Sequence, residues 1–405
     1  MLEDYKGLSR EASYLIYGGL LPSLAFGMFY VDISYFLTTI QGLSGLFMGT
    51  LIMLMGITMV VSSIPLGIIA DRYGRRKLLI VGNVLASFVI ALFALTVDPI
   101  LLMLAALIQG ISEAAYNASG SALLAEKAGD ERRTSAFSLS FFVSNIGFGL
   151  GSFAIPLVFV FEAYGMNDKE AHVMLYLVMA TLSLAATAFL LKVSESKSLR
   201  KAEGIGGLLP RKSWKVLVRY VVTGSIIAFG AGMVVPLMTY WLALMYGVSD
   251  AVSGPILGIS SFLMGFTTLV VPFLARRVGV VRAIVVTQGL STVFMLATPF
   301  SPNYLIASGV YIIRSFLMNM SNPLEQSLIM GLVSPDERGA ASGISAALWR
   351  LPNSISTAIG AGLMQSGALA EPFYIATILY VTSITIFWFA FSSMKLPEEM
   401  TMKGV

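Results

Sequence analysis

The sequence predicts an all-helical integral membrane protein, in which twelve transmembrane helices form two six-helix bundles related by a pseudo-two-fold axis. Three observations lead to this fold class: the composition, the spacing of apolar runs, and a repeat between the two halves. Hydrophobic residues make up 57% of the 405 residues and charged residues only 12%, whereas soluble domains carry roughly 25% charged residues. The mean hydropathy is +0.83. A chain so poor in charge is expected to have a bilayer rather than water as its solvent.

Twelve apolar runs are long enough to cross a bilayer core, which takes roughly 20 residues in a helix. Glycine and proline within some runs do not argue against helix, since membrane helices tolerate both. The predicted spans lie near residues 13–38, 45–70, 78–97, 99–125, 135–161, 172–193, 215–246, 252–275, 281–300, 303–331, 339–368 and 371–392.

The basic residues predict the topology. Cytoplasmic segments of membrane proteins carry an excess of Lys and Arg. With both termini in the cytoplasm, 23 of the 26 basic residues fall on the cytoplasmic side, Lys169 falls outside, and Arg314 and Arg350 fall within helices. A missed or added helix would move alternate loops to the other side, so this asymmetry supports the number of spans.

A repeat at an offset of 205 or 206 residues relates the two halves. It is carried by three pairs of motifs: Gly27-Met28 with Gly232-Met233, Gly74 with Gly279, and Asp130-Glu131-Arg132 with Asp336-Glu337-Arg338. Agreement at three places indicates a duplicated six-helix unit, which is the architecture of secondary transporters. The expected domains are an N-terminal bundle over 1–193, a cytoplasmic basic linker over 194–214 and a C-terminal bundle over 215–405.

The loop after the second span carries the most specific motif. It reads Gly-Ile-Ile-Ala-Asp-Arg-Tyr-Gly-Arg-Arg-Lys over residues 67–77. This loop resembles the signature G-x-x-x-D-R-x-G-R-R/K of the major facilitator superfamily at every fixed position. Together with the spans, the repeat and the basic linker, the resemblance covers the whole chain. It implies the fold of that superfamily and the transport of a solute by alternating access.

The resemblance also implies a conformational latch in this loop. Asp71 lies at the C-terminal end of its helix, where the helix dipole disfavours an anion, and its implied partners are the start of helix 11 near Gly339 and nearby arginines. Gly67 would let another helix approach closely. The predicted latch residues are Gly67, Asp71, Arg72, Gly74, Arg75 and Arg76. The second half has no acid at the equivalent place, so the latch is expected in one half only. The alternative is that the basic residues serve only as topology signals.

Charged side chains inside the membrane are expected to carry function, because each costs roughly 2.5–3.5 kcal/mol near the bilayer centre. Asp32 lies in the first span and Glu113 in the fourth, and neither has an acidic counterpart in the second half. Burial favours the protonated form of a carboxyl group and a nearby arginine favours the ionised form. Asp32 and Glu113 are therefore the predicted proton-coupling residues. The alternative is that they form static pairs with Arg314 or Arg350.

The resemblance places the first, fourth, seventh and tenth helices around a central cavity, so polar and aromatic residues on these helices are candidates for binding the substrate. The predicted substrate-binding residues are Tyr35, Tyr116, Asn117, Tyr240, Trp241, Arg314, Asn319, Glu325 and Arg350, and Asn145 is a further candidate. Arg350 lies on the eleventh helix, beside this cavity rather than on it.

No pattern indicates an enzyme, a metal site, a cofactor or a nucleic-acid partner. The chain has no cysteine and one histidine, His172, which excludes thiolate sites and sites with several histidines. His172 is interpreted as an interfacial residue rather than a proton relay. The basic residues lie between apolar runs, which indicates topology rather than nucleic-acid binding.

The leading prediction is a secondary active transporter, specifically a proton-coupled exporter (an antiporter) of an amphipathic or cationic small organic compound. Glycines at 147, 149 and 151 match the glycine-rich signature of proton-driven exporters only in part, and they also suit close helix packing. One alternative is a carrier of an organic anion or metabolite bound by Arg314 and Arg350. Another is a non-transporting receptor or scaffold on the same fold. We expect a monomer in the plasma membrane of a prokaryote, with a small solute and protons as partners.

Overall fold

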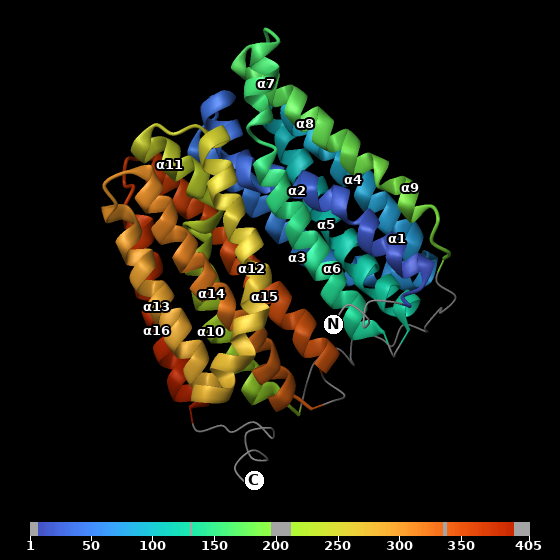
Figure 1. Cartoon of the computed structure of the whole chain (residues 1–405), viewed down its shortest axis with the longest axis vertical. Helices are drawn as coiled ribbons and strands as arrows, with labels where there is room; N and C mark the ends of the chain where they lie inside the picture. The colour runs from blue at the N-terminus through green and yellow to red at the C-terminus, as the bar shows by residue number, and fades with distance from the viewer. Residues whose placement is uncertain (1–6, 130–131, 196–211, 335–337, 393–405) are drawn as a thin grey trace. The chain divides into compact units, whose positions relative to one another are not determined.

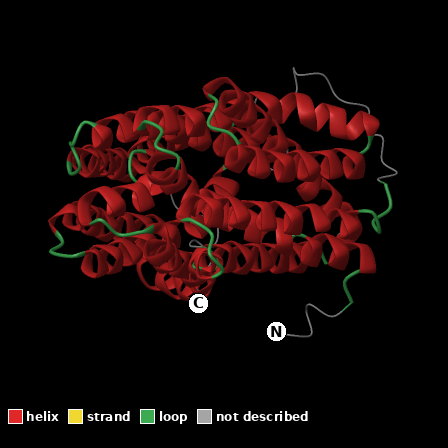
Figure 2. Ribbon diagram, turned by 90° about the horizontal axis from the view of Figure 1, so that it is seen from above, coloured by secondary structure: helices red, strands yellow, loops and turns green. Residues whose placement is uncertain are grey.

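The computed structural model describes residues 7–129, 132–195, 212–334 and 338–392, and for some helical positions, Asp71 among them, only the backbone. This part of the chain is almost entirely helical and contains no strand (Figure 2). Nine of its helical segments are long and apolar enough to cross a membrane. Helices α12, α14 and α15, of 29, 29 and 28 residues, bring the number to the predicted twelve. The predicted fold class is confirmed.

The first six spans lie in the first part of the chain (Figure 1). Three of them are interrupted: the first at Gly19, the fifth near Pro156, whose nitrogen cannot donate a helical hydrogen bond, and the sixth at Ala186. The elements are α1 (Arg10–Gly18), α2 (Leu20–Tyr35), the π-helical η2 (Phe36–Ile40), α3 (Gly45–Tyr73), α4 (Arg75–Leu95), α5 (Pro99–Ala128), α6 (Arg133–Phe153), α7 (Leu157–Ala163), α8 (Asp168–Ala185) and α9 (Thr187–Leu190).

The other six spans follow the linker. The first of them bends at a short 3-10 turn that contains a proline. The elements are α10 (Trp214–Gly232), η4 (Val235–Leu237), α11 (Met238–Tyr246), α12 (Asp250–Val278), α13 (Val280–Ala297), η5 (Thr298–Phe300), α14 (Tyr304–Leu332), α15 (Arg338–Gln365) and α16 (Glu371–Phe391).

The chain divides into two compact units. Unit 1 is Met1–Ala202 with Gly247–Phe262, and unit 2 is Glu203–Tyr246 with Leu263–Val405. The start of α12 thus groups with unit 1, because its small residues fit against α6 and the turn after it: a Cβ on Gly254 would lie 2.5 Å from Ile155 Cδ1, and one on Gly258 would lie 2.7 Å from Ser152 Cβ. Residues 196–211 of the predicted linker lie outside the described residues, and the predicted domain boundaries remain a prediction.

Equivalent glycines show the repeat in the packing of each unit. A Cβ on Gly27 in α2 would lie 2.0 Å from the carbonyl oxygen of Phe148 in α6. At the repeat offset, a Cβ on Gly232 in α10 would lie 1.9 Å from the carbonyl oxygen of Asn353 in α15. Both glycines let the backbone of the first helix of a unit touch that of the fifth.

A second pair of glycines ends the second span of each half. Gly74 has φ +114° and Gly279 has φ +85°, values that favour glycine because it has no Cβ. In both places the next helix begins at the following residue, at Arg75 and at Val280. The two loops therefore have the same construction, although their charged residues differ.

Large apolar side chains cover outward faces of the helices. Ile100 is 69% exposed, Val61 68% and Phe389 77%. An apolar surface of this extent is expected where helices face lipid rather than water.

Candidate functional site

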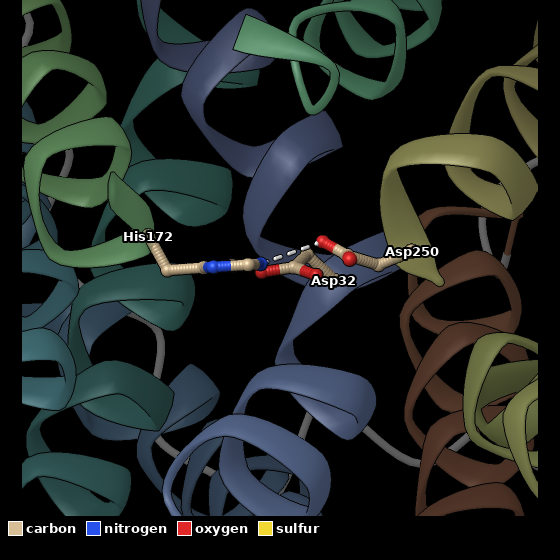
Figure 3. A group of neighbouring side chains, drawn as sticks. All are labelled: Asp32, His172 and Asp250. Carbon is tan, nitrogen blue, oxygen red and sulfur yellow. Dashed lines mark hydrogen bonds and ion pairs between the residues drawn. The ribbon is translucent and has the colours of Figure 1, made fainter. Parts of the chain in front are cut away.

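Asp32, His172 and Asp250 form a buried cluster that joins three helices of unit 1 (Figure 3). Asp32 lies on α2, His172 in the first turns of α8, and Asp250 is the first residue of α12. Their exposed fractions are 0%, 1% and 1%. One nitrogen or oxygen atom from each lies within 4.8 Å of the others. Two acids and one base thus share a site closed to solvent.

The start of α8 fixes the position of His172. Asn167 and Glu170 form a reciprocal capping box, in which each side chain accepts the other's backbone N–H at 3.0 Å. Two residues further on, the His172 ring places Nδ1 2.8 Å from the backbone carbonyl of Asp168. The ring also stacks on Phe36, with centroids 5.9 Å apart. The imidazole therefore has a defined orientation.

His172 and Asp250 must hold a shared proton. Nδ1 faces a backbone carbonyl, which only accepts, so Nδ1 carries a hydrogen. Nε2 lies 3.0 Å from Oδ2 of Asp250, and that hydrogen bond needs one further proton, on the imidazole or on the carboxyl group. In either form the pair of side chains has no net charge.

Asp32 is the member of the cluster whose charge has no partner in the His172–Asp250 pair. Within the described residues neither of its carboxylate oxygens accepts a hydrogen bond, and the hydroxyl of the fully buried Tyr176 makes none either. Burying an ionised carboxylate without donors is costly. Since the His172–Asp250 pair is neutral, the cluster is neutral when Asp32 is protonated and carries one negative charge when Asp32 is ionised. The cluster can therefore bind and release one proton.

The cluster also has the donor types of a metal site, two carboxylates and one imidazole. The sequence analysis excluded metal sites made of thiolates or of several histidines, but it did not consider a site made of two carboxylates and one imidazole. However, Nε2 of His172 is already hydrogen-bonded to Oδ2 of Asp250 at 3.0 Å. A metal ion bound by His172 would have to displace this hydrogen bond. The observed arrangement fits a proton better than a metal ion.

His172 corrects the sequence analysis, which interpreted it as an interfacial residue. Its position at the end of a span suggested the interface, but Phe36 and Asp250 cover it, and its side chain is 2% exposed. Asp250 was not predicted at all, because an acid at a helix start is ordinarily explained by the helix dipole. The one available signal was the spacing of Asp168 and His172, four residues apart on one helix face.

Glu113, the other predicted proton-coupling residue, lies in different surroundings. Its Oε2 accepts a hydrogen bond of 2.7 Å from the hydroxyl of Tyr30. Tyr30 and Asp32 are two residues apart on α2, about 200° around the helix. The two acids therefore meet α2 on different faces, and Glu113 is half-buried rather than enclosed.

The predicted substrate-binding residues of unit 1 are dispersed. Tyr35 belongs to the buried cluster, where its ring stacks on His172 at 6.4 Å. Tyr116 is half-buried against an apolar cluster, and Asn117 is exposed. Asn145 donates to a backbone carbonyl of its own helix at 2.8 Å. Of these residues, only Tyr35 lies beside the cluster of Asp32, His172 and Asp250.

Tyr240 and Trp241 lie in the interior of unit 2. Trp241 is fully buried, its Nε1 donates to the carbonyl of Leu369 at 2.9 Å, and its ring centroid lies 4.9 Å from that of Phe373. Tyr240 is 5% exposed. These contacts favour a packing role for Trp241 over the predicted contact with substrate.

Arg314 is buried on α14, at 3% exposure. Its Nη2 donates to the hydroxyl of Tyr380, and its guanidinium lies over the rings of Tyr380 and Tyr311, 5.4 and 5.8 Å from their centroids. Nε makes no hydrogen bond within the described residues. A buried cation whose described contacts are aromatic is a suitable binding group for an anion.

The remaining polar candidates of unit 2 have partners on their own or neighbouring helices. Glu325 accepts hydrogen bonds from Gln288 at 2.5 Å and from Ser321 at 2.8 Å. Asn319 donates to the backbone of its own helix at 2.8 Å. Arg350 is half-buried on α15. The side chain of Glu325 and the backbone carbonyl of Arg314 both accept hydrogen bonds from side chains of α13.

Part of the predicted latch lies outside the described residues, namely the Asp71 side chain and its contact near Gly339. At Gly67, no described atom lies within 4 Å of the position that a Cβ would take. Among the described residues no helix approaches Gly67 closely, and its part in a latch stays a prediction.

The loop's other residues are tied to unit 1. The carboxylate of Glu195 caps α4, accepting the N–H groups of Arg76 at 2.9 Å and Lys77 at 3.3 Å. A Cβ on Gly74 would lie 2.6 Å from that carboxylate. Glycine is thus needed at position 74 for space as well as for its φ angle.

Two of the loop arginines have defined partners in unit 1. Arg75 lies 3.4 Å from the carboxylate of Glu126. Arg76 donates to the carbonyls of residues 190 and 191, at 3.2 and 2.9 Å. Arg72 is exposed. The loop therefore does more than signal topology, although a latch that opens and closes remains a prediction.

The twelve spans, the paired glycine contacts and the buried charges define a helical membrane protein built as two related halves. The sequence profile of the Major Facilitator Superfamily matches residues 15–357 and again residues 224–400. The chain belongs to the Major Facilitator Superfamily, and membership of that family implies a transporter.

Known relatives support the fold. An uncharacterized membrane protein of Saccharomyces cerevisiae, YJR124C, is 22% identical over 385 residues, which cover 82% of this chain and 85% of that protein. The nucleoside transporter NupG has a TM-score of 0.75 at 14% identity, covering 96% of this chain and all of NupG. A bacterial homologue of the human lysosomal transporter Spinster has a TM-score of 0.77 at 14% identity, covering 95% and 96%. The human organic anion transporter MFSD10 has a TM-score of 0.63 at 17% identity, covering 93% and 99%.

Proposed function

We propose that this transporter is driven by protons and that Asp32 is the residue that takes up and releases the coupling proton. The observation that carries the proposal is a fully buried carboxyl group, without hydrogen-bond donors among the described residues, beside a pair of side chains that already holds a shared proton. Such a group is stable in the closed site only when it is neutral.

Alternating access supplies the other half of the cycle. When the site opens to water, an ionised Asp32 is hydrated and the proton can leave; when it closes, protonation removes the cost of a buried charge. The titratable groups in and around the cluster come from three helices: Asp32 and Tyr35 from α2, Asp168, His172 and Tyr176 from α8, and Asp250 from α12.

For the substrate, we propose export of an amphipathic or cationic organic compound in exchange for protons, in a prokaryotic plasma membrane, by a monomer. Glu113, hydrogen-bonded to Tyr30, is proposed as a second acidic group that serves either the proton or a cationic solute.

An organic anion is the second candidate substrate, and Arg314 favours it. The guanidinium is buried among tyrosines, and a carboxylate or phosphate would supply the charge that its aromatic neighbours do not. The structural likeness to an organic anion transporter agrees with this candidate. The two candidate functions predict different effects of replacing Arg314: an anion carrier should lose substrate binding, and an exporter of a cation should keep it.

The test begins with a thermal-shift screen of the purified protein, because a bound ligand raises apparent stability. A stabilising compound is then assayed in proteoliposomes with the wild type and with Asp32→Asn, which resembles the protonated form. The matched control is Asp98→Asn, since Asp98 is an exposed N-cap and asparagine caps equally well.

We expect Asp32→Asn to lose accumulation driven by a pH gradient while keeping exchange between equal solutions, and Asp98→Asn to keep both. Gradient-driven accumulation that persists in Asp32→Asn would refute the proton role. Arg314→Gln decides between the two substrates. If an anionic compound no longer raises the melting temperature of this variant, and the variant is otherwise as stable as the wild type, the protein is an anion carrier. If a cationic compound raises the melting temperature of the variant as much as that of the wild type, the protein is the exporter.

A further inference from the structure

A groove of about 670 Å³ lies in unit 2 between α13 and α16, which run side by side (Figure 1). It is separate from every residue discussed above as a proton, solute or latch candidate. Its lining combines two arginines, at the ends of neighbouring helices, with apolar and aromatic side chains.

The two arginines are brought together by the tight turn at Gly279. Arg277 lies in the last turn of α12, and Arg282 lies in the first turn of α13. The φ angle of +85° at Gly279 lets the second helix start immediately. Arg277 and Arg282 are both exposed. The distribution of basic residues along the chain predicts that this end of the bundle faces the cytoplasm.

The rest of the groove is apolar and faces outward. Val286 lies one helical turn from Arg282 along α13, with 50% exposure, and Phe389 on α16 is 77% exposed. Ile384 and Trp388, four residues apart on α16, line the other side. The half-buried Trp388 is close to the end of α16, at Phe391, the position where tryptophan is favoured at a membrane interface.

We propose that this groove binds an anionic phospholipid of the cytoplasmic leaflet. The phosphate would sit between the guanidinium groups of Arg277 and Arg282, an acyl chain would lie over Val286 and Phe389, and Trp388 would lie at the level of the ester groups. Basic pockets between membrane helices on the cytoplasmic side suit anionic headgroups. A free anion would bind the two arginines but leave the apolar side chains of the groove uncovered, whereas a phospholipid would contact both the arginines and the apolar side chains.

The test uses the full-length protein in nanodiscs of phosphatidylcholine, with phosphatidylglycerol carrying brominated acyl chains as the probe. Brominated chains quench nearby tryptophan fluorescence. The variant is Arg277→Gln with Arg282→Gln, and the matched control is Lys215→Gln with Arg219→Gln, two exposed basic residues of α10 outside the groove. Trp388→Phe identifies the quenched residue, and inorganic phosphate in phosphatidylcholine nanodiscs tests the free anion.

We expect saturable quenching by phosphatidylglycerol that disappears in Trp388→Phe and weakens about thirtyfold in the arginine variant, because each arginine near an anionic surface contributes about one factor of five. The control variant with Lys215→Gln and Arg219→Gln should be quenched as strongly as the wild type.

Equal quenching in the two double variants, or equal quenching by brominated phosphatidylcholine, would overturn the proposal. Stabilisation by inorganic phosphate alone would also overturn it in favour of an anion site. If the arginine variant does not fold, Val286→Phe should fill the groove and abolish the quenching of Trp388; unchanged quenching would count against the proposal.

Discussion

The chemistry of the buried cluster depends on how one histidine and two aspartates divide their protons. The carbonyl of Asp168 fixes which His172 nitrogen carries a hydrogen, so the other nitrogen and Asp250 must share a proton at 3.0 Å. This leaves Asp32 as the group whose charge can change. The sequence predicted Asp32 because a charge in mid-span is costly, but it could not predict the partners, which lie at span ends where charge is common.

His172→Leu should destabilise the protein by about 3 kcal/mol, because Asp250 would then be a buried carboxylate without its partner. The double change His172→Leu with Asp250→Leu should cost less than the single change, since it removes both buried polar groups. Unfolding in detergent, followed by circular dichroism, measures both. Equal costs for the single and double variants would show that the two residues are not coupled.

At the scale of helices, small residues decide where backbones can touch. Gly27 and Gly232 sit at equivalent crossings of the first and fifth helices of each unit. Gly147 and Gly151 of the fifth span also meet the backbone of α2, because a Cβ on Gly151 would lie 1.9 Å from the carbonyl oxygen of Leu24. The glycines that match the exporter signature in part therefore have a packing role.

Gly27→Ala should destabilise the protein by roughly 1–3 kcal/mol, because the new methyl group meets the backbone of α6 and cannot be relieved by a rotamer change. Gly289→Ala is the matched control, since no described atom lies within 4 Å of its Cβ position in the middle of α13. The control should be neutral or more stable, because alanine favours helix. Thermal melting of both variants checks this. A control as unstable as Gly27→Ala would mean that helix contact is not the cause.

At the scale of the whole molecule, the repeat carries the fold and the differences between its halves carry the proposed chemistry. The twelve spans and the equivalence of the two halves could be predicted because apolar length, basic loops and glycine positions are local signals. The inclusion of Gly247–Phe262 in unit 1 and the meeting of Asp32, His172 and Asp250 depend on long-range packing, which no local pattern encodes.

The predicted topology can be checked with single cysteines, because the chain contains none. Cysteines at Asp98 and Lys169 should react with an impermeant thiol reagent added to intact cells. Cysteines at Arg72 and Arg277 should react only after the membrane is permeabilised. Labelling of the second pair in intact cells would reverse the orientation and remove the cytoplasmic assignment of the lipid groove.

The central claim is that Asp32 carries the coupling proton, and infrared difference spectroscopy of the reconstituted protein during a pH step tests it directly. Protonated carboxyl groups have a carbonyl band that is lost when they ionise. We predict that the wild type and Asp98→Asn show this band changing with pH, and that Asp32→Asn lacks the part of the change that comes from the buried carboxyl group. A band of unchanged size in Asp32→Asn would contradict the account.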